Sequence, residues 1–171
     1  MAKKKNVNNK QIATLVSVLL GVIAVIMIFL PAIGVKDSET TYTGLQIVFG
    51  YSEKTVLGTA EFFAFSFMNL LTYILAIAGV VFAVLSYLGK GSKFASLIAL
   101  VAFAIAGVFF FLQVAFCVPN EGLESVVSGI GGLFGKETSI KDSLSLAVGS
   151  IIGAIASILS ALAMAYNTFT K

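Results

Sequence analysis

Four long apolar stretches divide the sequence, and they constrain its fold more than any other feature. They cover about residues 12–33, 62–88, 94–118 and 144–166. Each is longer than the roughly 20 apolar residues that a helix needs to cross the hydrocarbon core of a bilayer. Lipid satisfies no backbone hydrogen bonds, so helices are the structure expected for such stretches. The sequence therefore predicts an all-α membrane protein with four transmembrane helices.

The overall composition agrees with a membrane protein and gives no indication of a nucleic-acid partner. Hydrophobic residues make up 58% of the 171 residues, charged residues make up 11%, and the mean hydropathy is +1.03. A soluble domain of ordinary composition is far less apolar. The net charge of +3 is the sum of segregated positive and negative regions. The lipid bilayer, and not a nucleic acid, is therefore the expected partner.

Charged residues are segregated between the two sides of the apolar stretches. Both termini and the connection at 89–93 contain lysines and no carboxylates, whereas every aspartate and glutamate falls in the loops 34–61 and 119–143. By the positive-inside rule, the chain is a multi-pass protein of the cell membrane with cytoplasmic termini and two long outer loops. The lysines that carry this inference are Lys3, Lys4, Lys5, Lys10, Lys90, Lys93 and Lys171.

The first stretch has a second interpretation as a cleavable signal peptide. Three lysines precede it, and small residues follow at 32–34. Its length favours a permanent helix, because the apolar region of a signal peptide has only about 7–15 residues. Cleavage stays open as the alternative.

The connection at 89–93 is so short that the second and third stretches must form an antiparallel pair. With all four stretches crossing in turn, the sequence predicts an antiparallel four-helix bundle. The whole chain, 1–171, is expected to form this single membrane domain.

Residues 40–51 of the first outer loop are rich in β-branched and aromatic side chains in alternating positions, which predicts a strand. A turn at 50–54 and a short strand at 55–57 would complete a β-hairpin. Two strands alone are marginal in water, so this hairpin is expected to lie on the helix ends or against a partner. The candidate partner-contact residues are Tyr42, Leu45, Ile47, Phe49 and Tyr51.

The second outer loop is predicted to contain a short amphipathic helix. Its apolar residues recur at helical spacing, at Leu123, Val126, Val127, Ile130, Leu133 and Phe134. Three glycines within this segment weaken the helix by up to about 1 kcal/mol each relative to alanine. A short or irregular helix is therefore expected.

Amide side chains are rare in the apolar stretches, and two of them are expected to meet. Asn69 and Gln113 lie near the outer ends of the second and third stretches, at similar depth in an antiparallel pair. A hydrogen bond between helices contributes about 0.6–2 kcal/mol in a membrane. The pair is either a structural bridge or part of a ligand site, and both interpretations stay open.

A small residue occupies every fourth position along the fourth stretch, which lets another helix backbone approach closely. This stripe is predicted to pack against helices of the same chain or, alternatively, against a helix of a second chain. It consists of Ser145, Gly149, Gly153, Ser157, Ala161 and Ala165.

The sequence offers few groups for catalysis, metal binding or charge-coupled transport. No aspartate, glutamate or lysine lies within the four stretches, which disfavours proton relays and related transporters. Cys117 is the only cysteine and there is no histidine, so an intrachain disulfide and the common soft-metal ligand sets are excluded. No catalytic, cofactor or metal residue is assigned, and the chain is expected not to be an enzyme.

Four helices, cytoplasmic ends, a strand-prone first outer loop and Gly44-Leu45 within that loop resemble the claudin-like tetraspan architecture. In outline the chain is also similar to small four-helix integral membrane proteins of bacteria. The resemblance implies topology alone, because the sequence has no tryptophan and Cys117 lies outside the first loop. The claudin signature disulfide is thus absent, and a role in cell junctions is not implied.

These patterns favour a non-enzymatic membrane scaffold or accessory subunit that contacts other membrane or envelope proteins through its outer loops and helix seams. The alternative is a homo-oligomeric channel, or a carrier of lipids or small molecules, in which several copies line a path. Rings of acidic residues select cations without any charge buried in a helix, so this alternative stays open.

Overall fold

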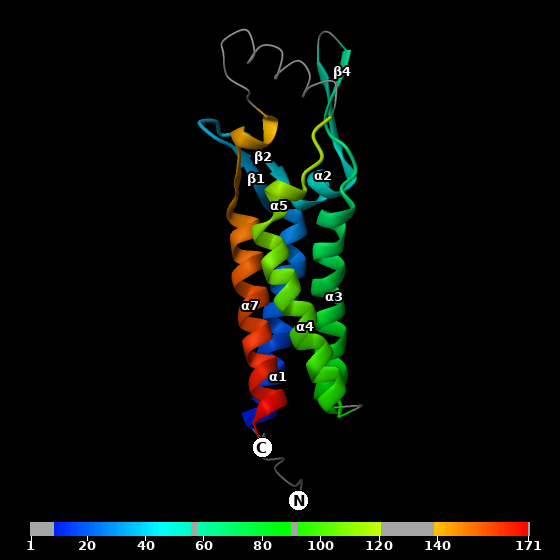
Figure 1. Cartoon of the computed structure of the whole chain (residues 1–171), viewed down its shortest axis with the longest axis vertical. Coiled ribbons are helices and arrows are strands. Elements are labelled where there is room, and N and C mark those ends of the chain that lie inside the picture. The colour runs from blue at the N-terminus through cyan, green and yellow to red at the C-terminus, as the bar shows by residue number, and fades with distance from the viewer. Residues whose placement is uncertain (1–8, 56–57, 90–91, 121–138, 171) are drawn as a thin grey trace, which may run out of the picture.

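Four long helices form the body of the molecule in the computed structural model, which describes residues 9–55, 58–89, 92–120 and 139–170 (Figure 1). As the sequence predicts, each helix is long and apolar enough to cross a membrane. They are α1 (Asn9–Ile26), α3 (Phe67–Tyr87), α4 (Ser92–Phe111) and α7 (Val148–Phe169). Both α1 and α4 pack against both α3 and α7, so the four helices close into a ring.

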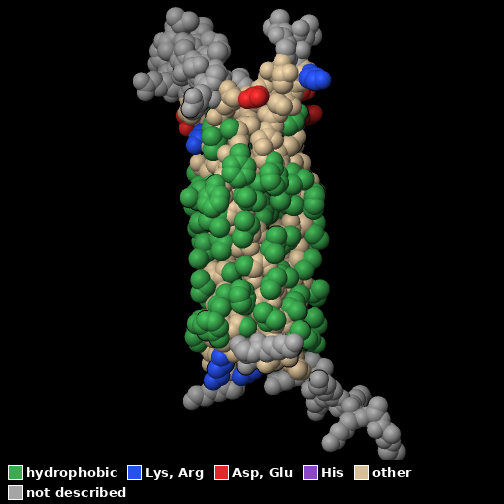
Figure 2. Space-filling view, turned by 90° about the vertical axis from the view of Figure 1, so that its right-hand side faces the viewer, with side chains coloured by type: hydrophobic (Ala, Val, Ile, Leu, Met, Phe, Trp, Pro, Cys, Tyr) green, Lys and Arg blue, Asp and Glu red, His purple; other side chains and the backbone are tan. Residues whose placement is uncertain are grey.

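The helical body has two chemically different ends. α1 and α4 begin, and α3 and α7 end, at one end of the body, here named the terminal end, and the strands lie at the opposite loop end (Figure 1). On the face shown in Figure 2, an apolar band without charged side chains separates the two. Lys10 and Lys93 begin helices at the terminal end. The described carboxylates all belong to loop-end segments, and they are Asp37, Glu39, Glu53, Glu61 and Asp142.

Glycines let the helices approach closely, and two phenylalanines fill the resulting notches. A Cβ atom added to Gly21 of α1 or Gly79 of α3 would lie 2.5 or 2.7 Å from the Phe103 ring of α4. In the same way, a Cβ atom on Gly153 of α7 would lie 2.6 Å from the Phe110 ring. Both rings are fully buried. Close approach of this kind is how helices associate where lipid gives no hydrophobic driving force.

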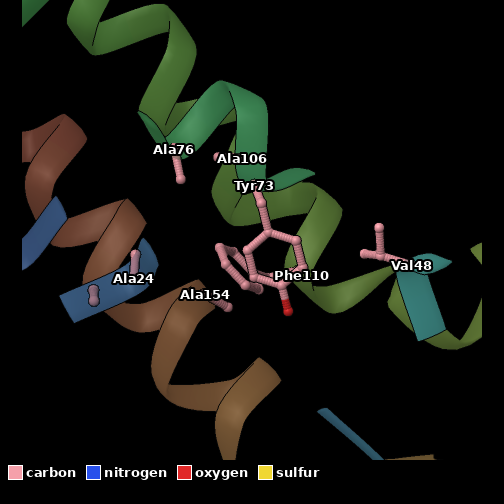
Figure 3. Packing of buried hydrophobic residues seen from close by; sticks show 8 residues of the cluster. Ala24, Val48, Tyr73, Ala76, Ala106, Phe110 and Ala154 are labelled. Carbon is pink, nitrogen blue, oxygen red and sulfur yellow. The ribbon is translucent and has the colours of Figure 1, made fainter. Parts of the chain in front are cut away.

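Figure 3 shows the packing around Phe110. Its ring meets that of Tyr73 edge to face, with ring centroids 5.3 Å apart and an interplanar angle of 89°. This geometry contributes about 0.5–1.5 kcal/mol beyond the buried area. One alanine from each of the four helices belongs to the same cluster, namely Ala24, Ala76, Ala106 and Ala154.

Reciprocal hydrogen bonds join the first and last helices. The Ser17 hydroxyl donates to the Ser160 carbonyl oxygen at 3.0 Å, and the Ser160 hydroxyl donates to the Ser17 carbonyl oxygen at 3.1 Å. Both serines are fully buried. α1 and α7 therefore lie side by side although these serines are 143 residues apart in the sequence.

A three-stranded antiparallel sheet with the order β2-β1-β5 covers the loop end. Its strands are β1 (Pro31–Val35), β2 (Thr41–Thr43) and β5 (Leu144–Leu146). The short helix η1 (Met27–Phe29) connects α1 to β1. At one edge of the sheet, the short helix η2 (Ile140–Ser143) precedes β5, and β5 is followed by α7. The sheet thereby links the loop ends of the first and last helices.

A short helix, α2 (Gly44–Phe49), and a hairpin of β3 (Tyr51–Thr55) and β4 (Gly58–Phe63) connect β2 to α3. The hairpin projects away from the helices (Figure 1). Its base is held on the β4 side, where the Asn120 N–H donates to the Phe62 carbonyl oxygen at 3.1 Å.

The single strand predicted for residues 40–51 is wrong in its central part, which forms α2. The Thr43 side chain accepts from the Gln46 N–H at 3.4 Å, and Gln46 Oε1 accepts from the Thr43 N–H at 2.8 Å. This reciprocal capping box starts a helix despite the strand-like composition. Gly50, with a φ of 93°, then ends α2 in a conformation that favours glycine. A hairpin is present, but it pairs 51–55 with 58–63.

The long helices are shorter at the loop end than the apolar stretches predicted. α1 with η1 ends at Phe29, α3 begins at Phe67, α4 ends at Phe111 and α7 begins at Val148. Several of the remaining apolar residues form strands, and others form the short helix α5 (Gln113–Phe116). Hydropathy alone does not separate an apolar strand from the end of an apolar helix. The amphipathic helix predicted for the second outer loop lies outside the described residues.

Replacing Gly153 with leucine is expected to destabilise the fold by about 1–3 kcal/mol, because the new side chain overlaps the Phe110 ring. Unfolding of the purified protein in detergent, followed by circular dichroism, measures the loss. Ile152→Leu is the matched control, since Ile152 is 39% exposed. A Gly153→Leu variant as stable as the control, but unable to self-associate, would instead assign this position to contact with a second chain.

Candidate functional site

A cluster of buried, uncharged polar side chains lies where the helices meet the loop end. Asn69 and Tyr73 come from the first two turns of α3, Gln113 from α5 and Ser150 from the first turn of α7. Tyr73 is 2% exposed and the other three are fully buried. Ser66 caps α3, because its side chain accepts from the Asn69 N–H at 3.3 Å. The start of α3 and the position of Asn69 are therefore fixed together.

Gln113 is at the centre of this cluster. Its Nε2 lies 3.0 Å from the Tyr73 hydroxyl, and its Oε1 is hydrogen-bonded to the Ser150 hydroxyl. Ser150 Oγ also lies 2.5 Å from the Ala32 carbonyl oxygen in β1. The contacts of one glutamine and one serine thus connect α3, α5, α7 and the sheet.

Proton counting favours one amide orientation of Gln113. A serine hydroxyl has one proton, so Ser150 cannot donate fully to both the Ala32 oxygen and an amide oxygen. With the amide oxygen and nitrogen exchanged, Tyr73 donates to Gln113, Gln113 donates to Ser150, and Ser150 donates to Ala32. Amide orientation is assigned from such networks, and this orientation gives each contact one donor and one acceptor.

Asn69 makes weaker contacts than Gln113. Its Nδ2 donates to the backbone oxygen of Gln113 at 3.4 Å and lies 3.8 Å from Cys117 Sγ. Its buried Oδ1 has no hydrogen-bond partner among the described residues. The structure brings Asn69 and Gln113 together, as expected, but the bond goes to the backbone of Gln113, whose side chain contacts Tyr73 and Ser150.

Cys117 completes the cluster as a protonated thiol. It is 1% exposed, and its Sγ donates to the Gln113 carbonyl oxygen at 3.2 Å. Burial raises the pKa of this thiol to about 11, while the hydrogen bond with Asn69 and the charge of Lys141 act in the opposite direction. The thiol is therefore neutral at physiological pH and a poor nucleophile.

The cluster is arranged to fasten structural elements together. None of its side chains is charged, and each forms at least one hydrogen bond to another part of the same chain. Buried polar networks of this kind specify one packing of the surrounding helices. Sequence reasoning found Asn69 and Gln113 but missed Ser150, because Ser150 is one of several serines in an apolar helix.

The five candidate partner-contact residues divide into buried and exposed groups. Tyr42 and Ile47 are 8% and 0% exposed and belong to the apolar core of the loop end. Leu45 and Phe49, one helical turn apart on α2, are 36% and 61% exposed. Tyr51 is half-buried against Tyr42, with ring centroids 5.5 Å apart. The helical spacing of α2, which replaces the predicted alternation, accounts for this division.

The small-residue stripe of the fourth stretch is occupied within the chain along much of its length. Gly149 faces the backbone of Pro31, where an added Cβ atom would lie 2.6 Å from the carbonyl oxygen. Gly153 faces Phe110, and Ser157 and Ala161 are buried. Of the remaining members, Ser145 lies in β5 and Ala165 is half-buried.

No protein-family model, curated protein or solved structure matches this chain.

Gln113→Leu is expected to cost about 1–3 kcal/mol of stability, since Tyr73 and Ser150 lose a shared partner in a buried site. Asn69→Leu should cost less, because Asn69 forms one long bond and carries an unpaired oxygen. Unfolding in detergent compares the two variants. If Asn69→Leu leaves the fold intact but abolishes binding of a ligand or partner, the structural interpretation of Asn69 is wrong.

The Cys117 thiol is expected to resist maleimide labelling at pH 7 in the folded protein. Because its pKa is raised to about 11, the thiolate fraction, and with it the labelling rate, should rise about tenfold per pH unit up to that value. Mass spectrometry follows the reaction, and the protein denatured in SDS is the control. Equal labelling of the folded and denatured protein at pH 7 would contradict this prediction.

Proposed function

We propose that this protein is a non-enzymatic scaffold or accessory subunit of the cell membrane that binds another membrane or envelope protein through its loop end. The β3–β4 hairpin, which projects beyond the helices as a folded element, is the observation that carries the proposal (Figure 1). Together with the three-stranded sheet, it makes the loop end a structured surface.

The proposed orientation is an antiparallel four-helix bundle with the loop end outside and both chain ends in the cytoplasm. Lys10 and Lys93 at the terminal end support it, as does the placement of the described carboxylates at the loop end. Lysines next to helix ends determine the orientation of multi-pass proteins. The claudin-like resemblance belongs to this proposal as an outline of topology only.

The edge of β3 is the proposed partner-binding element. β4 is joined at its base to residues 118–120, whereas β3 pairs with β4 and with no other strand among the described residues. Ser52, Glu53 and Lys54 on this edge are exposed. An extended segment of a partner can add to such an edge through backbone hydrogen bonds. The charges of Glu53 and Lys54 restrict indiscriminate pairing.

The contrasting proposal is a channel, and the helical interior does not favour a path through one chain. Phe103, Phe110 and Met164 are fully buried where the helices meet. A path would therefore have to run between several copies of the chain.

Replacing residues 53–60 with an Asn-Gly turn is the sharpest test, since it removes the tip of the hairpin and keeps the Ser52 and Glu61 pair. Wild-type protein, crosslinked and purified from its native membrane, should carry a different protein in fixed ratio. The shortened variant should lose that protein while its unfolding transition is unchanged. Glu39→Gln, an exposed change outside the hairpin, is the control.

A closed homo-oligomer would contradict the scaffold proposal if it passes ions in liposomes and survives the hairpin deletion. That outcome would establish the channel alternative.

A further inference from the structure

The terminal end contains a basic hollow between α1, α4 and α7. Its volume is about 620 Å³, and Lys10, Lys93, Ser96 and Asn167 are among its lining residues. Its lining residues belong to the terminal end, at the opposite end of the helices from the proposed partner-binding hairpin (Figure 1). The hollow is therefore separate from the polar cluster at the loop end.

Ser96 and Asn167, which line the hollow, belong to a polar network with one residue from each long helix. Asn167 Nδ2 lies 2.9 Å from the Thr14 hydroxyl and 3.2 Å from the hydroxyls of both Ser86 and Ser96. The oxygens of Ser86 and Ser96 are 2.6 Å apart. Thr14 and Ser96 are each 2% exposed. These hydrogen bonds fix the wall without using any charged side chain.

The electrostatics of the hollow favour an anion. Lys10 Nζ donates to the Thr170 carbonyl oxygen at 2.6 Å, which holds its ammonium group at the rim. α1 and α4 begin at this end and α3 and α7 end here, so the helix dipoles largely offset one another and the two lysines supply the positive charge of the hollow. No carboxylate among the described residues lies at the terminal end. Among the described residues, no acidic side chain therefore neutralises Lys10 and Lys93.

The surroundings of the hollow favour a lipid as the source of that anion. Phe169 also lines the hollow and is 74% exposed, so an exposed apolar side chain borders the same hollow as the two lysines. The volume lies in the range typical of small-molecule sites and exceeds the needs of a bare phosphate. Basic pockets between transmembrane helices are suited to the phosphate of an anionic headgroup.

We infer that this hollow binds the phosphate of an anionic lipid headgroup at the membrane surface. Lys10 and Lys93 supply the charge, and Ser96 and Asn167 form the polar wall. This site is independent of the partner proposed for the loop end, because the residues involved are at opposite ends of the helices.

Lipid titration followed by native mass spectrometry tests the inference on the full chain in neutral detergent. The probes are phosphatidylglycerol, phosphatidylcholine with the same acyl chains, and inorganic phosphate. The wild type should retain phosphatidylglycerol in preference to phosphatidylcholine. Lys10→Gln with Lys93→Gln should weaken this binding by roughly tenfold or more, given the contribution expected of each lysine near an anionic surface.

Lys36→Gln with Lys54→Gln is the matched control, because it removes the same charge at the loop end. Competition by millimolar inorganic phosphate would identify the phosphate group alone as the ligand, whereas its absence would identify the whole headgroup. Equal retention of the two lipids, or an equal loss in the control, would overturn the inference.

Asn167→Asp provides a second variant if the lysine pair proves necessary for folding. It keeps the shape of the wall and places a carboxylate beside the hydroxyls of Ser86 and Ser96. The added negative charge should repel the headgroup and abolish the preference for phosphatidylglycerol at an unchanged unfolding transition. A preserved preference in a folded Asn167→Asp variant would place the lipid elsewhere.

Discussion

Close approach of helix backbones is the constraint on which the rest of this structure depends. Four apolar helices gain little by hiding from lipid, so contact between them must come from packing. Phe103 meets this need by occupying the notch formed by Gly21 and Gly79, and Phe110 does so against Gly153. The exposed isoleucines, leucines and valines are then free to face lipid. The contacts of α4 with α3 and with α7 thus each pair a large ring with a missing side chain.

The structure of the loop end reflects a second requirement: backbone N–H and C=O groups outside the helices also need hydrogen-bond partners. β1 meets it by pairing on both sides, with β2 and β5. The Ala32 carbonyl oxygen accepts from the Ala147 N–H and contacts Ser150, which ties the sheet to the start of α7. Gln113 extends the same network to α3. The helices therefore end where this layer of strands and polar side chains begins.

The sequence predicted the helices well because length and hydropathy are local properties. It predicted their ends poorly, since residues 31–33, 62–63 and 144–146 of the predicted stretches pair as strands with segments outside their own stretch. At 40–51, the capping box of Thr43 and Gln46 outweighed the alternation of β-branched and aromatic residues. Propensity describes single residues, whereas a cap depends on two side chains three positions apart.

The candidate site was predictable only in part, for a related reason. Asn69 and Gln113 stand out as polar residues in apolar helices, and the short connection between α3 and α4 places them at one depth. The contribution of Ser150 depends on how α7 packs, and no local pattern encodes that packing. The network of Thr14, Ser86, Ser96 and Asn167 likewise needs all four helices in place.

The contact between α1 and α7 can form only late in synthesis, because α7 follows the other three long helices in the sequence. Ser17 exchanges hydrogen bonds with Ser160 of α7. α1 is therefore synthesised long before the helix that supplies these hydrogen bonds. Until then, α1 can pack against α3 and against the Phe103 ring of α4. Insertion of α7 therefore closes the ring, joins β5 to β1 and satisfies Ser17 and Gln113 in one step. Among the four long helices described, α7 is thus the one that completes the packing at both ends.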